Sequence, residues 1–353
     1  MPGNKPGAVR VREMLTDAEV LVAHRPLAMI VVDDVAKYYG SHCAVRDLEF
    51  TIEEGECVGF LGLNGAGKTT TLRMLSCLLL PTSGRIEVRG LDVVDDSHEI
   101  RRLIGYLPDN PPLYAEMSVC EYLKFAGKLR GLSDSRCRQR LDLVLGECNL
   151  GGVENTQIAS LSHGYRQRVG IAQAIIHDPS LLILDEPIQG LDPVQIVDMR
   201  AMIRNLRGRH TILLSTHILS EIEQTCDRIL MMHEGRIAAE GSEEQLAERY
   251  GAGQGLELEA RGAADTLREA LDKLACVDHA SVRETGEDSV LLATLRVADS
   301  EREAVSRAVI EAGLGLLGMR RVTTGLENIF VQLSKGAGSV KDPGSTTPGE
   351  VSS

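Results

Sequence analysis

Short apolar runs alternate with stretches of helical periodicity through the first two-thirds of the chain. Apolar runs of this length, bounded by turn residues, predict buried strands, and they fall at residues 29–32, 57–61, 181–184 and 211–214. Strands that alternate with helices are typical of an α/β fold with a parallel sheet. The pattern therefore predicts an α/β core, which we place at residues 28–248.

The segment from Ser118 to Leu150 has a different pattern, because Leu, Arg and Glu recur there at helical spacing. This spacing predicts two or three helices inserted into the core. With its flanks, the inserted helical subdomain is expected at about residues 110–160.

A break in composition at GAGQG, near residues 250–255, separates the core from a second pattern. The apolar positions beyond it predict the order βαββαβ, that of ferredoxin-like α+β domains. The second of its helices places Val305, Ala308, Val309 and Ala312 on one face. The strands are expected near residues 256–260, 279–284, 289–297 and 316–322, and the helices near 264–275 and 301–312. We place this accessory domain at residues 255–336, ending in the amphipathic stretch LENIFVQLSK.

The two ends of the chain have little periodicity. Residues 1–27 are expected to form a flexible leader, and the Gly, Ser and Pro content of residues 337–353 predicts a disordered tail. Neither end is expected to carry chemistry.

Composition narrows the class of function. The chain has 353 residues, 43% of them hydrophobic, and a formal net charge of −13. Phosphate backbones attract clustered Lys and Arg, so this charge argues against a nucleic-acid coat and leaves only a local basic patch open. No direct nucleic-acid partner is therefore expected.

The apolar segments predict where the protein lies in the cell, and the cysteine spacing predicts the redox state of the thiols. The apolar stretch from Leu72 to Leu80 is interrupted by Arg73 and Ser76 and is too short to cross a bilayer. The first residues, MPGNKPGAVRVREML, lack the apolar block of a signal peptide, so we expect a cytoplasmic protein. The eight cysteines are scattered without zinc spacing, and we expect them to be reduced and mostly buried.

A glycine-rich loop, GLNGAGKT, follows the apolar strand CVGFLG and precedes a helical run. It matches G-x-x-x-x-G-K-[ST] in the setting of a phosphate-binding loop, where backbone N–H groups and a helix N-terminus point at the phosphates. Lys68 would add a point charge, and the Thr69 hydroxyl would contact Mg²⁺. The expected ATP-binding residues of this loop are Gly62, Leu63, Asn64, Gly65, Ala66, Gly67, Lys68, Thr69 and Thr70.

A second element, LLILDEP, ends an apolar strand with two adjacent carboxylates. Asp185 suits a contact with Mg²⁺, and Glu186 can polarise the water that attacks the γ-phosphate. Together with the glycine-rich loop, this pair predicts a phosphate-cleaving site that uses Mg²⁺.

The segment LSHGYRQ resembles the signature of ABC ATPases, and the resemblance covers roughly residues 29–246 in the family's order. It implies that Ser162 and Gly164 complete the ATP site of a partner subunit at a helix N-terminus. His163 and Tyr165 depart from the usual LSGGQ, which has Gly and Gln at these positions.

Other matches extend the resemblance. Tyr39 resembles the aromatic that stacks on adenine, and His217 resembles the switch histidine that touches the γ-phosphate, which makes His217 catalytic beside Glu186. Asp192 in GLDP resembles the polar group of the loop that couples the two sites. Asp109 stands where the family has a Gln that contacts Mg²⁺ and the membrane partner, and a carboxylate can also bind a hard cation.

The stretch from LSHGYRQ to GLDPVQ is most similar to ATPase subunits whose membrane partners are ABC-2 type permeases, and within these to the gliding-motility type. This implies an ATP-hydrolysing homodimer, or a pair with a related ATPase subunit. Such a dimer lies peripherally on the inner face of the membrane and drives a separate multi-span permease. Two alternatives stay open: a mechanical clamp on a ribosome or nucleic acid, and a nucleotide-dependent regulator whose C-terminal domain binds a ligand or protein.

Overall fold

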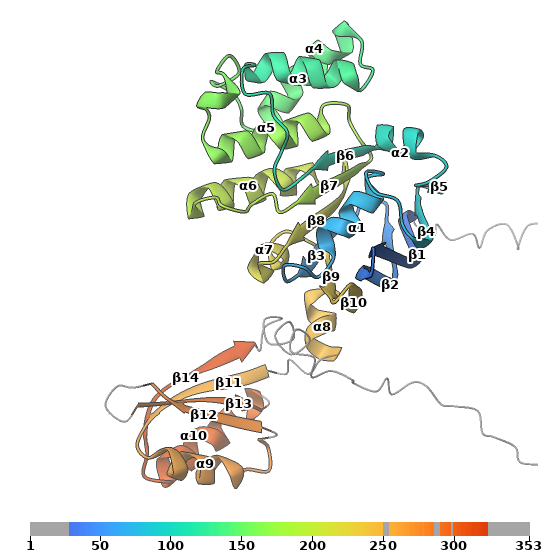
Figure 1. Ribbon diagram of the computed structural model, residues 1–353. Helices are drawn as coiled ribbons and strands as arrows, with labels where there is room; N and C mark the ends of the chain where they lie inside the picture. Colours follow the sequence, from blue (N-terminus) through green and yellow to red (C-terminus); the bar gives the residue numbers. More distant parts are fainter. Residues whose placement is uncertain (1–27, 250–253, 278, 286–289, 298, 324–353) are drawn as a thin grey trace, which may run out of the picture.

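The computed structural model describes residues 28–249, 254–277, 279–285, 290–297 and 299–323 (Figure 1). The expected leader, the expected tail and the stretch LENIFVQLSK lie outside these residues. Among the described residues, no helix combines the length and apolarity that a membrane span requires.

A six-stranded sheet forms the centre of the core, in the order β10-β9-β3-β8-β7-β6. Five neighbouring strands are parallel, and β10 pairs antiparallel with β9 at one edge. The four strands predicted from apolar runs are confirmed, and three of them lie in this sheet. Its strands are β3 (Cys57–Gly62), β6 (Ile104–Leu107), β7 (Leu181–Asp185), β8 (Thr211–Thr216), β9 (Arg228–His233) and β10 (Arg236–Gly241).

An antiparallel sheet in the order β2-β1-β4-β5 packs beside the central sheet through a shared apolar cluster. Phe50 of β2 and Phe60 of β3 meet in that cluster, with ring centroids 5.9 Å apart. Its strands are β1 (Ala28–Tyr39), β2 (His42–Glu53), β4 (Ser83–Val88) and β5 (Leu91–Asp92).

Eight helices of the described core surround the two sheets: α1 (Lys68–Leu75), α2 (Ser97–Leu103), α3 (Val119–Leu129), α4 (Asp134–Glu147), α5 (His163–Ile175), α6 (Pro193–Leu206), α7 (Leu219–Glu223) and α8 (Glu243–Arg249). The insertion contains two long helices, α3 and α4, as the spacing predicts. Ser118 starts α3 with a capping box in which the Ser118 backbone N–H donates to the Glu121 carboxylate.

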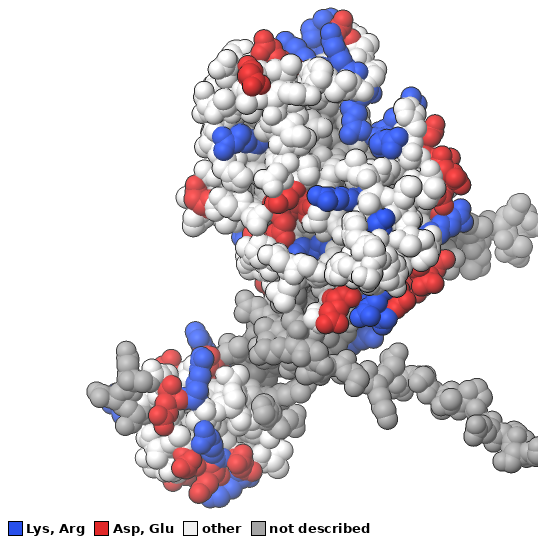
Figure 2. Space-filling view, in the orientation of Figure 1, with Lys and Arg blue, Asp and Glu red and all other residues white. Residues whose placement is uncertain are grey.

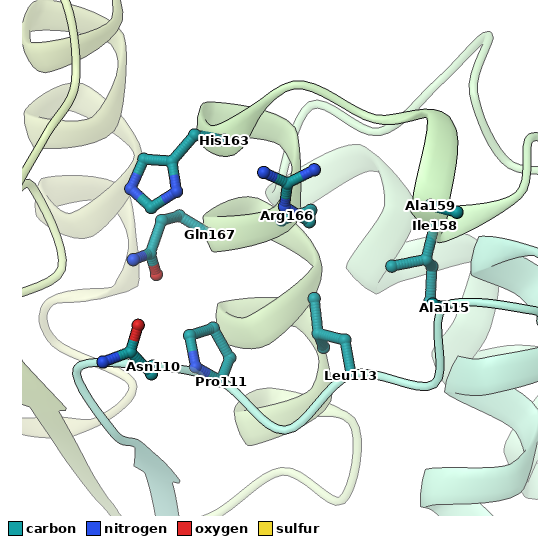
Figure 3. A pocket seen from close by; sticks show the side chains of 9 residues that line it. All are labelled: Asn110, Pro111, Leu113, Ala115, Ile158, Ala159, His163, Arg166 and Gln167. Carbon is teal, nitrogen blue, oxygen red and sulfur yellow. The ribbon is translucent and has the colours of Figure 1, made fainter.

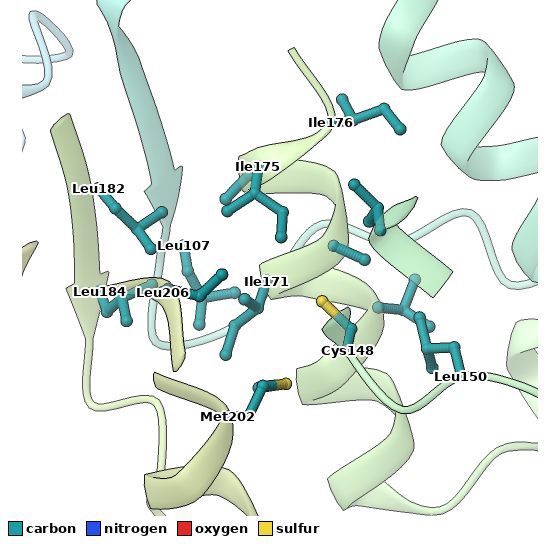
Figure 4. Packing of buried hydrophobic residues seen from close by; sticks show 14 of the residues in the cluster. Leu107, Cys148, Leu150, Ile171, Ile175, Ile176, Leu182, Leu184, Met202 and Leu206 are labelled. Carbon is teal, nitrogen blue, oxygen red and sulfur yellow. The ribbon is translucent and has the colours of Figure 1, made fainter. Parts of the chain in front are cut away.

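The inserted helices share one apolar core with the sheet (Figure 4). Leu182 and Leu184 of β7 pack in this core with Ile171 and Ile175 of α5, and Cys148 beyond α4 belongs to the same cluster. Because close-packed protein interiors deform little, this apolar core holds α5 firmly against β7, the strand that ends at Asp185.

Beyond residue 254 a separate antiparallel sheet has the order β12-β13-β11-β14. The predicted sequence βαββαβ is confirmed, and Val305 and Val309 are fully buried on the predicted helix face. The first helix ends at Asp272, three residues earlier than predicted, because the chain turns there and lets Leu274 and Val277 pack in the same cluster. The elements are β11 (Gln254–Arg261), α9 (Ala264–Asp272), β12 (His279–Glu284), β13 (Val290–Arg296), α10 (Arg302–Glu311) and β14 (Gly315–Thr323).

The eight cysteines are free thiols, as expected, but the expectation that most are buried is wrong. Cys57, Cys137 and Cys148 are buried, whereas the other five are partly exposed. Several of the five lie near the ends of helices and strands or in turns, where neighbouring residues cover only part of the side chain.

A buried histidine makes stability depend on pH. His177 lies between α5 and β7 along the chain, and its Nε2 is 3.1 Å from the Ile104 carbonyl oxygen. Burial lowers the pKa of His177 from 6.5 to about 4. Between pH 6.5 and about 4, His177 is therefore protonated in the unfolded chain and neutral in the folded chain. The free energy of unfolding consequently falls as the pH is lowered through this range.

The expected loss in this window is up to about 3 kcal/mol from His177. His177→Gln keeps a donor for the Ile104 carbonyl and cannot titrate, so its unfolding free energy should vary less across the window. Urea unfolding from pH 4.5 to 7 measures this, and equal slopes for both proteins would contradict it. Burial also lowers the pKa of His210, which leaves part of the slope in the variant.

Candidate functional site

The glycine-rich loop joins the end of β3 to the start of α1. Gly67 has φ of +104°, and a Cβ at this position would lie 2.7 Å from the Ala44 carbonyl oxygen. The loop therefore needs glycine at this position, both for its backbone conformation and for its contact with β2. The first N–H groups of α1 have no partners within the helix, so the loop offers donors to an anion.

Gly67→Ala should abolish high-affinity nucleotide binding, because it combines a strained φ with a clash against backbone. Gly65→Ala is the matched control, since Gly65 also has positive φ, +84°, but has open space around it. We expect the Gly65 variant to weaken binding by about fivefold, in line with about 1 kcal/mol of backbone strain. Titration with a fluorescent ATP analogue measures both, and equal losses would contradict the role of the close contact.

Lys68 is the first residue of α1 and is buried. Its Nζ donates to the Gly62 carbonyl oxygen at 2.7 Å and lies 3.3 Å from Oε1 of Glu186. The ammonium group of Lys68 thus lies inside the loop, and the carboxylate of Glu186 neutralises its charge. An incoming phosphate would compete with Glu186 for this charge.

Asp185 ends β7 close to the loop. The Ser215 hydroxyl on β8 donates to its Oδ1 at 2.6 Å, and the Thr69 hydroxyl lies 3.5 Å from the same atom. Burial raises the pKa of Asp185, and the nearby charges of Glu186 and Asp109 raise it further, while the two hydroxyls oppose this. Among the described residues, its buried Oδ2 has no hydrogen-bond partner.

These groups fit a magnesium ion. The buried, unpartnered Oδ2 needs a positive or donating group, and a carboxylate with a threonine hydroxyl beside it is the oxygen set that Mg²⁺ prefers. Asp185 and Thr69 would hold the ion, as the sequence predicts.

Glu186 is buried and has φ of +49°, a conformation that is uncommon outside glycine. Its backbone N–H donates to the carbonyl and the hydroxyl of Ser215, both at 3.1 Å, which holds the strained residue in place. The His217 Nδ1 lies 2.9 Å from Glu186 Oε2. One carboxylate oxygen therefore faces Lys68 and the other faces His217.

An open cleft of about 410 Å³ is lined by Lys68, Thr69 and Glu186, while Asp185 and His217 are not among its lining residues. Tyr39 borders it with its ring exposed, and Asp109 also lines it. Lys37 Nζ lies 5.5 Å from the centre of the Tyr39 ring. The other lining residues are His42, Ala44, Leu63, Asn64, Gly65, Gly67, Thr70 and Gln189.

The signature residues at the start of α5 are not among those that line this cleft. The Ser162 hydroxyl accepts from the Tyr165 N–H and caps the helix, and a Cβ on Gly164 would lie only 2.4 Å from Gln195 Oε1. Tyr165 is exposed, with the Arg168 guanidinium 5.6 Å from its ring centre.

The predicted coupling residue has a structural role in its own chain. Asp192 caps α6 through Oδ1, which accepts from the N–H groups of Val194 and Gln195. This cap fixes the end of the turn that begins at Glu186.

Beside the signature, a hollow of about 350 Å³ separates α5 from the segment after β6 (Figure 3). His163 and Gln167 lie one turn apart on α5, facing Asn110 and Pro111 across the hollow. The buried Gln167 amide lies 3.5 Å from the Asp109 carbonyl oxygen. The segment that carries Asp109 is thus tied to the signature helix.

Sequence reasoning missed Ser215, Gln167 and Gln189. Ser215 orders both carboxylate residues, Gln167 holds the Asp109 segment, and Gln189 lines the cleft. A polar residue buried at the end of an apolar strand was a usable signal for Ser215. Gln167 and Gln189 have no such signal, because only the folded chain brings their partners close.

Comparison with known proteins identifies the family of the chain. A family model described as ABC transporter matches residues 45–189. Among curated proteins, the uncharacterized ABC transporter ATP-binding protein YxlF of Bacillus subtilis (strain 168) is 42% identical over 221 residues, which covers 63% of this chain and 73% of that protein. The bacitracin transport ATP-binding protein BcrA of Bacillus licheniformis is 35% identical over 312 residues, which covers 87% of this chain and 98% of that protein.

Solved structures agree as well. The ATP-binding subunit of an ABC transporter aligns with a TM-score of 0.58 at 34% identity, covering 63% of this chain and 93% of its own. A dimeric ATP-binding cassette in a post-hydrolysis state with ADP and Pi aligns with a TM-score of 0.56 at 25% identity, covering 61% and 98%. The P-loop α/β core predicted from the sequence is thereby confirmed. Relatives that match over most of their own length at these identities show the family, and this chain belongs to the ATP-binding proteins of ABC transporters.

Proposed function

We propose that this chain is the ATP-hydrolysing subunit of an ABC-2 type exporter, working as a dimer that drives a separate membrane permease. One observation carries the proposal: Glu186 lies between Lys68, at 3.3 Å, and His217, at 2.9 Å, directly beside the phosphate loop. A carboxylate held there between a phosphate-binding cation and an imidazole is the arrangement needed to polarise a water against a γ-phosphate.

The contacts of Lys68 suggest how binding prepares the site. Lys68 is paired with Glu186 at 3.3 Å. An entering β,γ-phosphate attracts the ammonium group more strongly than one carboxylate does, which frees an oxygen of Glu186 to accept a proton from water. His217 keeps the other oxygen in place. Magnesium, when bound by Asp185 and Thr69, would neutralise charge on the phosphates.

Dimerisation is proposed because one chain does not complete the site. Ser162, Gly164 and Tyr165 lie outside the cleft formed by their own chain, on a helix N-terminus suited to an anion. A second copy placed head to tail, or a related ATPase subunit, would bring this helix N-terminus to the γ-phosphate. Loss of that phosphate would remove the bridge between the two chains and let them open.

A basic hollow of about 330 Å³ is the proposed docking place for the permease. Arg73, Arg101 and Arg130 line it together with the exposed Leu78. Arg130 donates to the Arg101 carbonyl, and Arg101 donates to the Cys77 carbonyl, so three segments are tied together around it. Among the described residues, no carboxylate lies within ion-pair distance of these three arginines.

Charge favours an acidic cytoplasmic loop of the permease as the occupant. Lys and Arg gather over the inserted helices and α2 in Figure 2, although the chain as a whole is acidic. An acidic helix or loop with an apolar side chain would match both the arginines and Leu78.

Relatives support the transporter assignment without fixing the cargo. Nod factor export ATP-binding protein I of Cupriavidus metallidurans is 37% identical over 220 residues, covering 62% of this chain and 73% of that protein. The cargo in the name of this protein differs from that of the bacitracin protein, so we propose export but no substrate. We also propose that residues 255–336 form an accessory domain, beyond the cassette at residues 28–248.

Two measurements test the proposal. The purified chain should hydrolyse ATP only with magnesium, and the chain isolated from membranes should bring a multi-span partner with it. Arg73→Glu should remove the partner and leave the ATPase of the free chain within about twofold, because Arg73 lies outside the nucleotide cleft. Retention of the partner by this variant would refute the docking place, and absence of magnesium-dependent ATPase in the wild type would refute the function.

A further inference from the structure

His163 stands at the position where the family signature has glycine, so its side chain adds a group that the family pattern lacks. It is the first residue of α5. Its Nε2 lies 3.1 Å from the carbonyl oxygen of Gln189 in the same chain. Since a carbonyl only accepts, the ring donates from Nε2. The side chain therefore makes a contact within its own subunit.

The partner of this hydrogen bond belongs to the turn that carries Glu186. The Gln189 N–H donates to the Glu186 carbonyl oxygen at 3.2 Å, and Gln189 lines the nucleotide cleft. Only two hydrogen bonds thus separate the His163 ring from the backbone of Glu186. Gly190, the next residue, has φ of +73°, and a Cβ there would lie 3.4 Å from His163 Nε2, so the ring packs closely on the turn.

A second contact joins the first turn of α5 to the start of α6, which directly follows the turn. Gly164 lies against the Gln195 side chain, in the first turn of α6. Movement of the 186–192 segment would therefore be transmitted to the first turn of α5 through His163, while Gly164 keeps that turn against the start of α6. The remainder of α5 is held by the apolar core, which leaves its first turn as the part able to respond.

We propose that His163 is a positioning residue that couples the two ATP sites of the dimer. The inference rests on the proposed function, in which the 186–192 segment belongs to a chain's own site and the first turn of α5 completes the site of its partner. A change at Glu186 on binding or cleavage of ATP pulls on Gln189. His163 passes this movement to the signature residues that face the other nucleotide.

His163→Ala removes the link, and His163→Gln offers a donor of similar reach. We expect the Ala variant to lower kcat by about fivefold to tenfold, in line with the loss of one hydrogen bond, and to change ATP affinity of the isolated chain by less than about twofold. The Hill coefficient of ATP hydrolysis should fall from near two toward one, because coupling between two sites is what raises it. The Gln variant should recover both values to within about twofold of the wild type.

The control is His98→Ala, which removes an exposed imidazole on α2, outside the turn, and should leave both values unchanged. If His163→Ala retains the wild-type Hill coefficient and kcat, or if the Gln variant fails to recover them, the coupling role is overturned. Absence of ATP-dependent dimerisation and hydrolysis in the wild type would instead refute the proposed function, so the two failures are distinguishable. Thermal unfolding of each variant verifies that the fold is retained.

Discussion

Replacing Glu186 by glutamine is expected to leave ATP binding intact and to slow hydrolysis by about 10²- to 10⁴-fold. The Glu186→Gln variant would keep the size of the side chain and the His217 contact, which joins Nδ1 to Oε2 at 2.9 Å, but its amide could not take a proton from water. With cleavage blocked, the bridging γ-phosphate would persist and the closed dimer would accumulate. Single-turnover hydrolysis and light scattering with Mg·ATP measure the two effects.

The matched control for this variant is Glu221→Gln. Glu221 is also buried near the end of β8, but it accepts from the Thr216 hydroxyl at 2.6 Å and does not line the cleft. Hydrolysis by the control should stay within about threefold of the wild type. Equal hydrolysis by the Glu186 variant and the wild type would remove Glu186 from the chemistry.

Replacing Lys68 by alanine is expected to weaken ATP binding by about 100-fold or more, since it removes a charge-assisted hydrogen bond to the phosphates. The variant also leaves the buried Glu186 without its cation, 3.3 Å away in the wild type, so an unpaired carboxylate would repel the triphosphate. Calorimetric titration with Mg·ATP measures the affinity.

A lysine outside the site provides the control for this titration. Lys128→Ala removes an exposed lysine of α3 that pairs with Asp134, and it should bind ATP as the wild type does. Full affinity in the Lys68 variant would contradict the assignment of the phosphate loop.

Much of the fold could be predicted from the sequence because local pattern and tertiary environment agree. The runs at 57–61 and 181–184 are apolar on both faces and become β3 and β7, which are buried on both faces. The loop at Gly62 could be identified because its glycines are required by backbone geometry, as Gly67 illustrates. The end of α9 could not be predicted. The apolar residues beyond Asp272 continue the helical pattern in the sequence, but in the structure they lie in a turn and pack into the same cluster from there.

The candidate site was predictable only where one short segment carries its chemistry. Lys68, Asp185, Glu186 and His217 meet as the motifs predict. Ser215 and the Gln189 carbonyl escaped prediction, because their roles depend on which strands and turns become neighbours. The same reason explains His163, whose partner is 26 residues away along the chain. Motif spacing cannot reveal such a contact.

Mixed dimers test directly whether each ATP lies between the phosphate loop of one chain and the signature of another. One chain carries Lys68→Ala and a tag, so that it does not bind nucleotide at its own loop, while the other chain is wild type. An ATP analogue with a photoreactive group on its γ-phosphate is added with magnesium, irradiated, and the labelled peptides are identified. We expect label on the tagged chain at the peptide containing Ser162. Label confined to the wild-type chain would contradict it.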